Sequence, residues 1–124
     1  MALRDPRILE RTLSAAERHV LSTFADLLRQ RYGEQLARLV VLGSRARGDV
    51  SDDSDIDVLV VLDVPIEQEA SAVDAVCALV TEAKRCEPAY VPISTIVMAS
   101  SRYGDLLRTE RRLALDAERE GIAL

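Results

Sequence analysis

Hydrophobic residues recur at helical spacing in three long segments of the chain. Apolar residues three or four positions apart predict a helix over residues 14–32, with Ser14 as its N-cap and Gly33 as its stop. Residues 66–85 show the same spacing and predict a second long helix. Residues 101–120 predict a last helix. These segments leave four shorter apolar runs between and after them.

Those shorter runs have the composition of strands. Residues 36–42 and 55–62 are rich in Val, Leu and Ile, and the twelve positions between them leave room for one short helix. Residues 90–99 predict a third strand, whose proline near the start suits the edge of a sheet. Residues 122–124 are long enough for a short terminal strand. The order α-β-α-β-α-β-α predicts an α/β (α+β) fold, a small mixed sheet with helices packed on it.

Length and composition indicate one globular domain spanning residues 1–124. A chain of this size buries roughly two thirds of the surface that its unfolded form exposes. The sequence has no run of 18 apolar residues, so we expect no membrane span. The N-terminal residues mix acids and bases where a signal peptide has an apolar segment, and we therefore expect a cytoplasmic protein.

The charge balance narrows the possible ligands. The chain has 16 basic and 21 acidic residues and a net charge of −5, whereas extended nucleic-acid binding normally needs a basic excess. We therefore expect no extended DNA or RNA partner, although a site for one nucleotide remains open. Cys77 and Cys86 lack the spacing of zinc ligands and are interpreted as reduced thiols.

Two carboxylates occupy the beginning of the second predicted strand. Side chains alternate along a strand, so Asp55 and Asp57 project from one side about 7 Å apart, while Ile56 and Val58 face the core. Two nearby carboxylates repel each other and lose solvation if they are buried. A divalent cation between them removes that repulsion, and Mg²⁺ prefers hard oxygen ligands. The pair therefore indicates a magnesium site.

A glycine-serine turn ends the first predicted strand. Gly43 lets a ligand approach the main chain closely, and Ser44 is the expected N-cap of a short helix whose backbone N–H groups bind phosphate. The turn faces Asp55 and Asp57 if the two strands run antiparallel. Arg45 and Arg47 are the nearest cations, and we expect only one of them to reach the phosphates, because residues two apart on a helix do not share a face.

The stretch GSRARGDVSDDSDIDVLV, which begins at Gly43, resembles the signature of the DNA polymerase beta-like nucleotidyltransferases. That signature reads GS-x-A-R-G, a spacer and S-D-x-D. The short chain resembles the minimal nucleotidyltransferase group, some members of which are antitoxins paired with a HEPN-domain protein. The resemblance implies a nucleotidyltransferase fold and the transfer of a nucleoside monophosphate. The matching positions are Gly43, Ser44, Ala46, Arg47, Gly48, Ser54, Asp55 and Asp57.

The resemblance also implies roles for these residues. Asp55 and Asp57 are the expected catalytic residues and ligands of two Mg²⁺ ions. Gly43, Ser44 and Arg47 are expected to bind the phosphates of a nucleoside triphosphate, which is expected to be ATP. Ser54 is expected to complete the nucleotide site as a turn or cap hydroxyl that orients the aspartates.

One family feature is missing from the sequence. Such enzymes use a third carboxylate on a later strand, whereas the predicted strand over residues 90–99 contains no Asp or Glu. Ser94 and Thr95 are the polar side chains in its interior, and Glu87 reaches the site only if the strand begins earlier. The two-metal site is therefore expected to be incomplete. The chain is a weak transferase, borrows a carboxylate from a partner, or is a catalytically inactive module that binds nucleotide or protein.

The acceptor of the nucleotidyl group is expected to be a protein or a small molecule. Larger relatives carry an additional domain that holds the acceptor. We therefore expect a second polypeptide or a second copy to supply that surface. The most specific form of this hypothesis is an antitoxin that acts on a HEPN-type partner protein, and a homo-oligomer is the other possibility.

Overall fold

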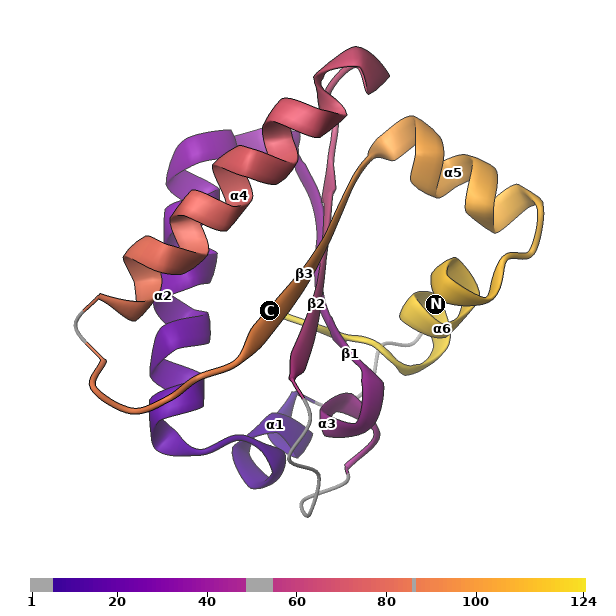
Figure 1. Cartoon of the computed structure of the whole chain (residues 1–124). Coiled ribbons are helices and arrows are strands. Elements are labelled where there is room, and N and C mark those ends of the chain that lie inside the picture. Colours follow the sequence, from indigo (N-terminus) through magenta and orange to yellow (C-terminus); the bar gives the residue numbers. More distant parts are fainter. Residues whose placement is uncertain (1–5, 49–54, 86) are drawn as a thin grey trace.

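The computed structural model describes residues 6–48, 55–85 and 87–124. Within these ranges the chain forms a central sheet with helices on both faces, as Figure 1 shows. The elements, including two 3-10 turns, are α1 (Arg7–Thr12), α2 (Ala15–Tyr32), η1 (Gly33–Gln35), β1 (Leu36–Leu42), α3 (Gly43–Arg47), β2 (Ile56–Leu62), η2 (Ile66–Gln68), α4 (Glu69–Lys84), β3 (Ile93–Ala99), α5 (Ser100–Arg108), α6 (Arg112–Glu120) and β4 (Ile122–Ala123).

The sheet is mixed, with the strand order β3-β2-β1-β4. β1 runs antiparallel to both β2 and β4, and β2 runs parallel to β3 through the α4 crossover. The predicted fold class is therefore confirmed, as are the antiparallel first two strands and the edge position of the third. No helix in the described part of the chain has the length and apolar character needed to cross a membrane.

One face of the sheet carries the larger core. Every second residue of β2 from Ile56 to Leu62 points to this face and is fully buried. α2 contributes Val20, Phe24 and Leu28, and α4 contributes Val76. α2 begins with the predicted cap, because the Ser14 side chain accepts a hydrogen bond from the Glu17 N–H. The Glu17 carboxylate in turn accepts one from the Ser14 N–H.

The other face carries a smaller core under α5 and α6. Leu59 and Val61 of β2 meet Val40 of β1 and Met98 of β3 there, with Tyr103 of α5 above them. This core stops short of one end of the sheet, where Asp57 occupies the next position of β2 on the same face. The sheet is thus closed by helices on one face and only partly covered on the other.

The single predicted helix over residues 101–120 is wrong. The structure contains two helices, α5 and α6, separated by a turn in which Glu110 has φ of 52°. Thr109 and Arg111 N–H groups close this turn by hydrogen bonds to Asp105 and Leu106 carbonyl oxygens. The turn falls in the polar run RTERR, which offers no apolar side chain to hold a continuous helix on the sheet.

Two smaller expectations also need correction. α3 begins at Gly43, so Ser44 lies in its first turn and is not the N-cap. The first helix, α1, was missed because six residues are too few to show helical periodicity, although its Leu9 packs into the larger core. β3 begins at Ile93, three residues later than predicted.

Candidate functional site

The turn after β1 lies directly against the Asp57 side chain. Leu42, the last residue of β1, is opposite Asp57 in the antiparallel ladder. Gly43 follows with φ of 76°, in the left-handed region that favours glycine. A Cβ atom at Gly43 would lie 2.9 Å from the Asp57 carboxylate Oδ2. The missing side chain of Gly43 therefore leaves the space in which the Asp57 carboxylate meets the main chain of the turn.

α3 is fixed behind this turn by a buried arginine. Arg45 is 7% exposed, and its guanidinium donates hydrogen bonds to the Thr12 carbonyl oxygen (3.0 Å) and to both carboxylate oxygens of Glu17 (3.0 and 3.1 Å). Burial raises the pKa of Glu17, but the Ser14 backbone N–H and the Arg45 guanidinium outweigh it and hold that pKa below its usual value. Arg45 thus ties the turn to α1 and α2.

Arg47 is the arginine of α3 that stays at the surface. Its side chain is half exposed, and Nη1 lies 3.8 Å from the Glu120 carboxylate at the end of α6. An ion pair with this exposure is weak, and the side chain is available to a ligand. The two arginines of α3 therefore differ: Arg45 is buried, and Arg47 is at the surface.

The two predicted carboxylates differ in their surroundings. Asp55 is exposed and precedes β2, while Asp57 is half-buried within it. The Ile56 N–H between them donates to the Pro92 carbonyl oxygen (2.9 Å) in the segment that leads into β3. Both aspartates thus belong to one end of the sheet. Ser54, the remaining residue of the predicted site, lies outside the described residues.

Ser94 occupies the β3 position beside Asp57. The parallel register pairs the two residues, so their side chains share one face of the sheet. Because β3 begins at Ile93, Glu87 lies outside the strand, and its carboxylate accepts a hydrogen bond from the Ala89 N–H. Within the described ranges, no group of three or more His, Cys, Asp or Glu residues could hold a metal ion. β3, Ile93–Ala99, itself contains no Asp or Glu.

The donor set still fits one kind of metal. Mg²⁺ in nucleotide sites is commonly held by one or two carboxylates, with water and phosphate oxygens completing its six ligands. The Asp57 carboxylate beside the open main chain of Gly43, with Asp55 two residues earlier, matches that chemistry. The same two carboxylates do not suit a structural zinc site, which requires four nitrogen or sulfur ligands in most proteins.

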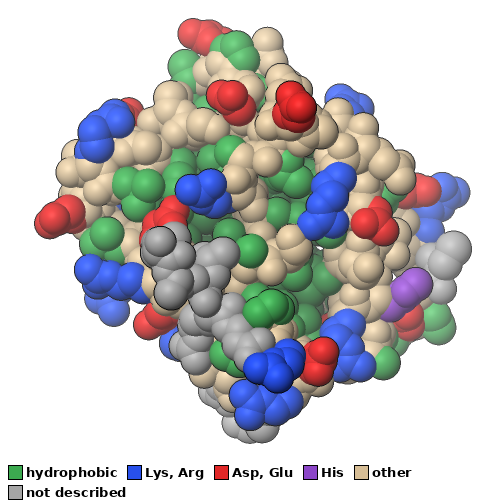
Figure 2. Space-filling model, turned by 180° about the vertical axis from the view of Figure 1, so that it is seen from behind, with side chains coloured by type: hydrophobic (Ala, Val, Ile, Leu, Met, Phe, Trp, Pro, Cys, Tyr) green, Lys and Arg blue, Asp and Glu red, His purple; other side chains and the backbone are tan. Residues whose placement is uncertain are grey.

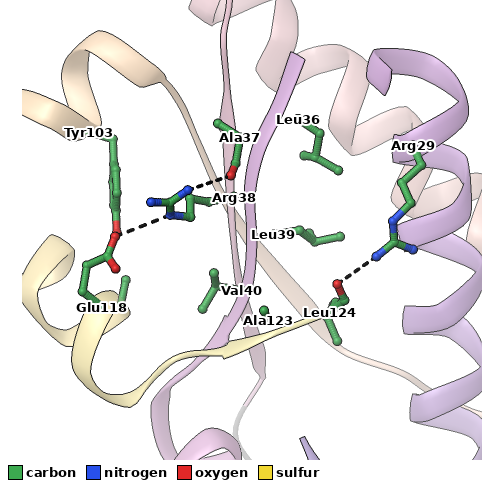
Figure 3. Close-up of a pocket in the computed structure, with 11 residues that line it drawn as sticks. Arg29, Leu36, Ala37, Arg38, Leu39, Val40, Tyr103, Glu118, Ala123 and Leu124 are labelled. Atoms are coloured by element: carbon green, nitrogen blue, oxygen red, sulfur yellow. Dashed lines mark hydrogen bonds and ion pairs between the residues drawn. The ribbon is translucent and has the colours of Figure 1, made fainter. Parts of the chain in front are cut away.

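A separate cleft of about 540 Å³ lies along β1, at a place where the sequence predicted no site. It lies on the side of the molecule that faces away from the viewer in Figure 1. Figure 2 shows hydrophobic side chains in the middle of this side with charged groups around them, and Figure 3 shows the cleft itself. The Tyr103 hydroxyl donates to Glu118 (2.8 Å), which also lies 3.5 Å from Arg38. Burial, followed by the bond to Glu118, raises the pKa of Tyr103, so the phenol stays protonated.

The sequence could not reveal this cleft, because no motif marks its lining. It forms where the short β4 covers only Val40 and Val41 of the longer β1. On the far side of the cleft, Arg29 donates a hydrogen bond to the Leu124 carbonyl oxygen (2.8 Å). The polar groups of the cleft thus bond mainly to one another. The lining includes Leu36 to Val40 of β1 but not Leu42, the residue that pairs with Asp57.

Comparison with known proteins places the chain among nucleotidyltransferases. The family model described as "Nucleotidyltransferase domain" matches residues 21–111. A protein of Methanocaldococcus jannaschii named "Putative protein adenylyltransferase" is 35% identical over 51 residues. This stretch is 41% of the chain and 51% of that protein, so the chain spans about half the length of the curated relative that it matches.

A solved structure from Sulfolobus solfataricus, titled as a putative nucleotidyltransferase, shows the same fold. The match covers 97% of this chain and 87% of the chain in that structure, with a TM-score of 0.50 and 15% sequence identity. The family model covers both the turn at Gly43 and the two aspartates, Asp55 and Asp57. The chain therefore belongs to the nucleotidyltransferase domain family, whose general reaction is the transfer of a nucleotidyl group.

Proposed function

We propose that the chain transfers a nucleoside monophosphate from Mg²⁺-bound ATP to a hydroxyl group of a protein or small molecule. The observation that supports this proposal is the close approach of the Asp57 carboxylate to Gly43, because it sets an anionic metal ligand beside the turn that begins α3. In this proposal Asp55 and Asp57 are the metal-binding and catalytic residues. Gly43, Ser44, Arg47 and Ser54 bind the nucleotide.

The residues of the turn bind and orient the triphosphate. The main chain of Gly43 and Ser44, at the start of α3, donates N–H groups to the β- and γ-phosphates beside the Asp57 carboxylate. Arg47 adds a charge-assisted hydrogen bond. Asp55 and Asp57 hold the Mg²⁺, which when bound neutralises phosphate charge and lowers the pKa of the acceptor hydroxyl.

The reaction is an in-line displacement at the α-phosphorus. The acceptor oxygen forms a new P–O bond, the bond between the α-phosphorus and its bridging oxygen breaks, and pyrophosphate leaves with that electron pair. The proton of the acceptor hydroxyl passes to solvent or to one of the two aspartates. Most of the rate enhancement comes from holding the two oxygens in line and stabilising the charge that develops between them.

The acceptor is proposed from the printed name of a relative. The archaeal relative is named as a protein adenylyltransferase, which favours a protein acceptor and ATP as donor. An antitoxin that modifies a HEPN-type partner protein is the most specific form of this proposal.

A labelling experiment tests the proposal. The protein is incubated with ATP labelled at the α-phosphate, Mg²⁺ and a cell extract, and acceptors are detected by their label. We expect label with the natural sequence, none with Asp55→Asn or Asp57→Asn, and unchanged label with Asp63→Asn. Asp63 is a matched control, because it is an exposed aspartate at the opposite end of β2. Equal labelling by Asp57→Asn contradicts the catalytic assignment.

The second candidate function is an inactive nucleotide-binding module of the same fold. It is favoured by β3, which contains no carboxylate and has Ser94 at the position beside Asp57. Under this alternative, ATP binds but no acceptor is labelled. The variant Ser94→Asp then separates the two functions. A rise in labelling shows a site that is competent for transfer, whereas binding without label in both proteins supports the inactive module.

A further inference from the structure

The register of the sheet places a serine hydroxyl beside Asp57. β3 runs parallel to β2, and its residue level with Asp57 is Ser94. The next residue on the same face of β3 is Ile96, which packs against the core under α5 and α6. Thr95 is level with Val58 and therefore lies on the opposite face, toward the larger core. Of the two hydroxyl-bearing residues of β3, Ser94 is thus the one that shares a face with the proposed metal ligand.

The helices on this face leave the Ser94 end of the sheet partly uncovered. Leu59 of β2 is fully buried under α5 and α6, whereas Ser94 and Asp57 are half-buried. Figure 1 shows α5 beginning at the opposite end of β3. The next hydroxyls along the chain, Ser100 and Ser101, lie at that far end. Ser94 and Asp57 are therefore both accessible to a ligand at this end of the sheet.

The turn at Gly43, the carboxylate of Asp57 and the hydroxyl of Ser94 follow one another across the sheet. Leu42, the residue before Gly43, is the neighbour of Asp57 on β1, and Ser94 is its neighbour on β3. Neighbouring strands lie about 4.8 Å apart, so the turn and the hydroxyl are on opposite sides of Asp57. A Cβ atom at Gly43 would lie 2.9 Å from the Asp57 Oδ2. The carboxylate therefore stands between the proposed phosphate site and Ser94.

This order matches the geometry of an in-line displacement. The attacking oxygen must approach the α-phosphorus from the side opposite to the leaving pyrophosphate. In the proposed function the β- and γ-phosphates lie at the Gly43 turn, so the leaving group is on the β1 side of Asp57. An attacking oxygen is then required on the β3 side, where Ser94 lies.

We propose that Ser94 is itself an acceptor, so that the chain attaches a nucleoside monophosphate to its own hydroxyl. The Ser94 Oγ forms a bond to the α-phosphorus of ATP, the bond between the α-phosphorus and its bridging oxygen breaks, and pyrophosphate leaves with that electron pair. The hydroxyl proton passes to solvent, and the product is a phosphodiester between Ser94 and adenosine. This inference rests on the proposed function, because it uses the same donor and the same site.

A hydroxyl held in the site also has an advantage over a dissolved one. Well-oriented reactions within one molecule reach effective concentrations of about 10⁵ M or more. β3 supplies no carboxylate to assist an acceptor, which lowers the rate for any hydroxyl. The fixed position offsets part of that loss for Ser94 but not for a hydroxyl that diffuses in from solution. The composition of β3 therefore favours Ser94 over a dissolved acceptor.

Incubation of the purified chain with ATP and Mg²⁺, without a cell extract, tests this inference. We expect the intact mass to rise by one adenylyl group per chain, and tandem mass spectrometry to locate that group on Ser94. ATP labelled at the α-phosphate should transfer its label, whereas ATP labelled at the γ-phosphate should not, which excludes phosphorylation. The first-order rate constant should be independent of protein concentration, because Ser94 and the nucleotide site belong to one sheet.

Variants at two neighbouring positions of β3 provide matched controls. Ser94→Ala should gain no mass, whereas Ser94→Thr keeps a hydroxyl at this position and should be modified. Thr95→Ala removes a hydroxyl from the opposite face and should be modified like the natural sequence. Calorimetry should show that Ser94→Ala still binds Mg²⁺–ATP, which separates the loss of an acceptor from the loss of the nucleotide site.

The outcomes distinguish this inference from the proposed function. If proteins of a cell extract are labelled but the chain itself gains no mass, the transfer reaction stands and self-modification is overturned. An adenylyl group on another residue, equal modification of Ser94→Ala, loss of ATP binding in Ser94→Ala, or a rate constant that rises with protein concentration also overturns it. If neither the extract nor the chain is labelled, the proposed transfer fails and this inference fails with it.

Discussion

The seven residues of β2 alternate between the two faces of the sheet, and these faces differ in character. Ile56, Val58 and Val60 are fully buried under α2 and α4, and their face is apolar along its whole length. The other face is equally apolar at Leu59 but ends in the half-buried Asp57. Because side chains alternate along a strand, the proposed metal ligand Asp57 and the core residues Ile56 and Val58 are sequence neighbours on opposite faces of the sheet. A substitution on one face should leave the property supplied by the other face unchanged.

The largest expected effect is on the reaction and comes from Asp57→Asn. Losing a metal ligand removes several kcal/mol of transition-state stabilisation, so single-turnover transfer should slow about a thousandfold. The free energy of unfolding should stay the same or rise, because the carboxylate lies close against Gly43 and the amide carries no charge. Rates from rapid mixing and urea unfolding curves measure the two effects. A large fall in the free energy of unfolding of Asp57→Asn would contradict the view that the two faces of β2 contribute separately.

Val58→Ala is the opposite case. Removing two methyl groups from a fully buried position leaves a cavity, and the free energy of unfolding should fall by about 2–4 kcal/mol. The transfer rate of the folded fraction should change less than twofold, since Val58 points away from the nucleotide site. Urea unfolding and single-turnover rates at a temperature well below the melting point check this prediction.

Alanine variants of Gly33 and Gly43 distinguish the cost of backbone strain from the effect of filling space at the proposed site. Gly43 and Gly33 both have positive φ, so alanine at either position should cost about 1 kcal/mol of stability. Nothing lies within 4 Å of a Cβ at Gly33, whereas a Cβ at Gly43 meets the Asp57 carboxylate. Only Gly43→Ala should therefore weaken binding of Mg²⁺–ATP, by about tenfold, as measured by calorimetry. If both variants bind Mg²⁺–ATP equally, nucleotide binding does not depend on the space that a Cβ at Gly43 would fill.

The smallest expected effect concerns acid stability. The pKa of Glu17 is lower in the folded chain than in the unfolded one, so its charge stabilises the fold above the unfolded pKa of about 4.3. That contribution is lost as the pH falls through the folded pKa. Glu17→Gln should therefore lower the free energy of unfolding by about 1 kcal/mol at neutral pH. In acid, the free energies of unfolding of the variant and the natural sequence should become more similar. Thermal unfolding at several pH values measures the difference.

The sequence was informative where one local signal decided the structure. The apolar run LVVL predicted β1, and Ser14 as N-cap predicted the start of α2. The antiparallel pairing of β1 and β2 places Leu42, which precedes Gly43, opposite Asp57, because antiparallel neighbours bring the end of one strand to the start of the next. The roles of Gly43, Asp55 and Asp57 in binding stay a prediction.

Other features depend on contacts between distant segments. The position of Ser94 opposite Asp57 depends on the register between β2 and β3, which the α4 crossover sets and no local pattern shows. The burial of Arg45 depends on α1 and α2, so the sequence could not tell which arginine of the turn is structural. The break between α5 and α6 was visible only as a polar run in an otherwise helical pattern.

The central claim is that Asp57 and the turn at Gly43 form one site for a metal-bound nucleotide. Titration calorimetry of the natural sequence and of Asp57→Asn with ATP, each with and without Mg²⁺, tests it most directly. The account predicts binding that requires Mg²⁺, is lost in Asp57→Asn and persists in Asp63→Asn. Binding of equal affinity by the natural sequence and Asp57→Asn, or no Mg²⁺-dependent binding by the natural sequence, would contradict it.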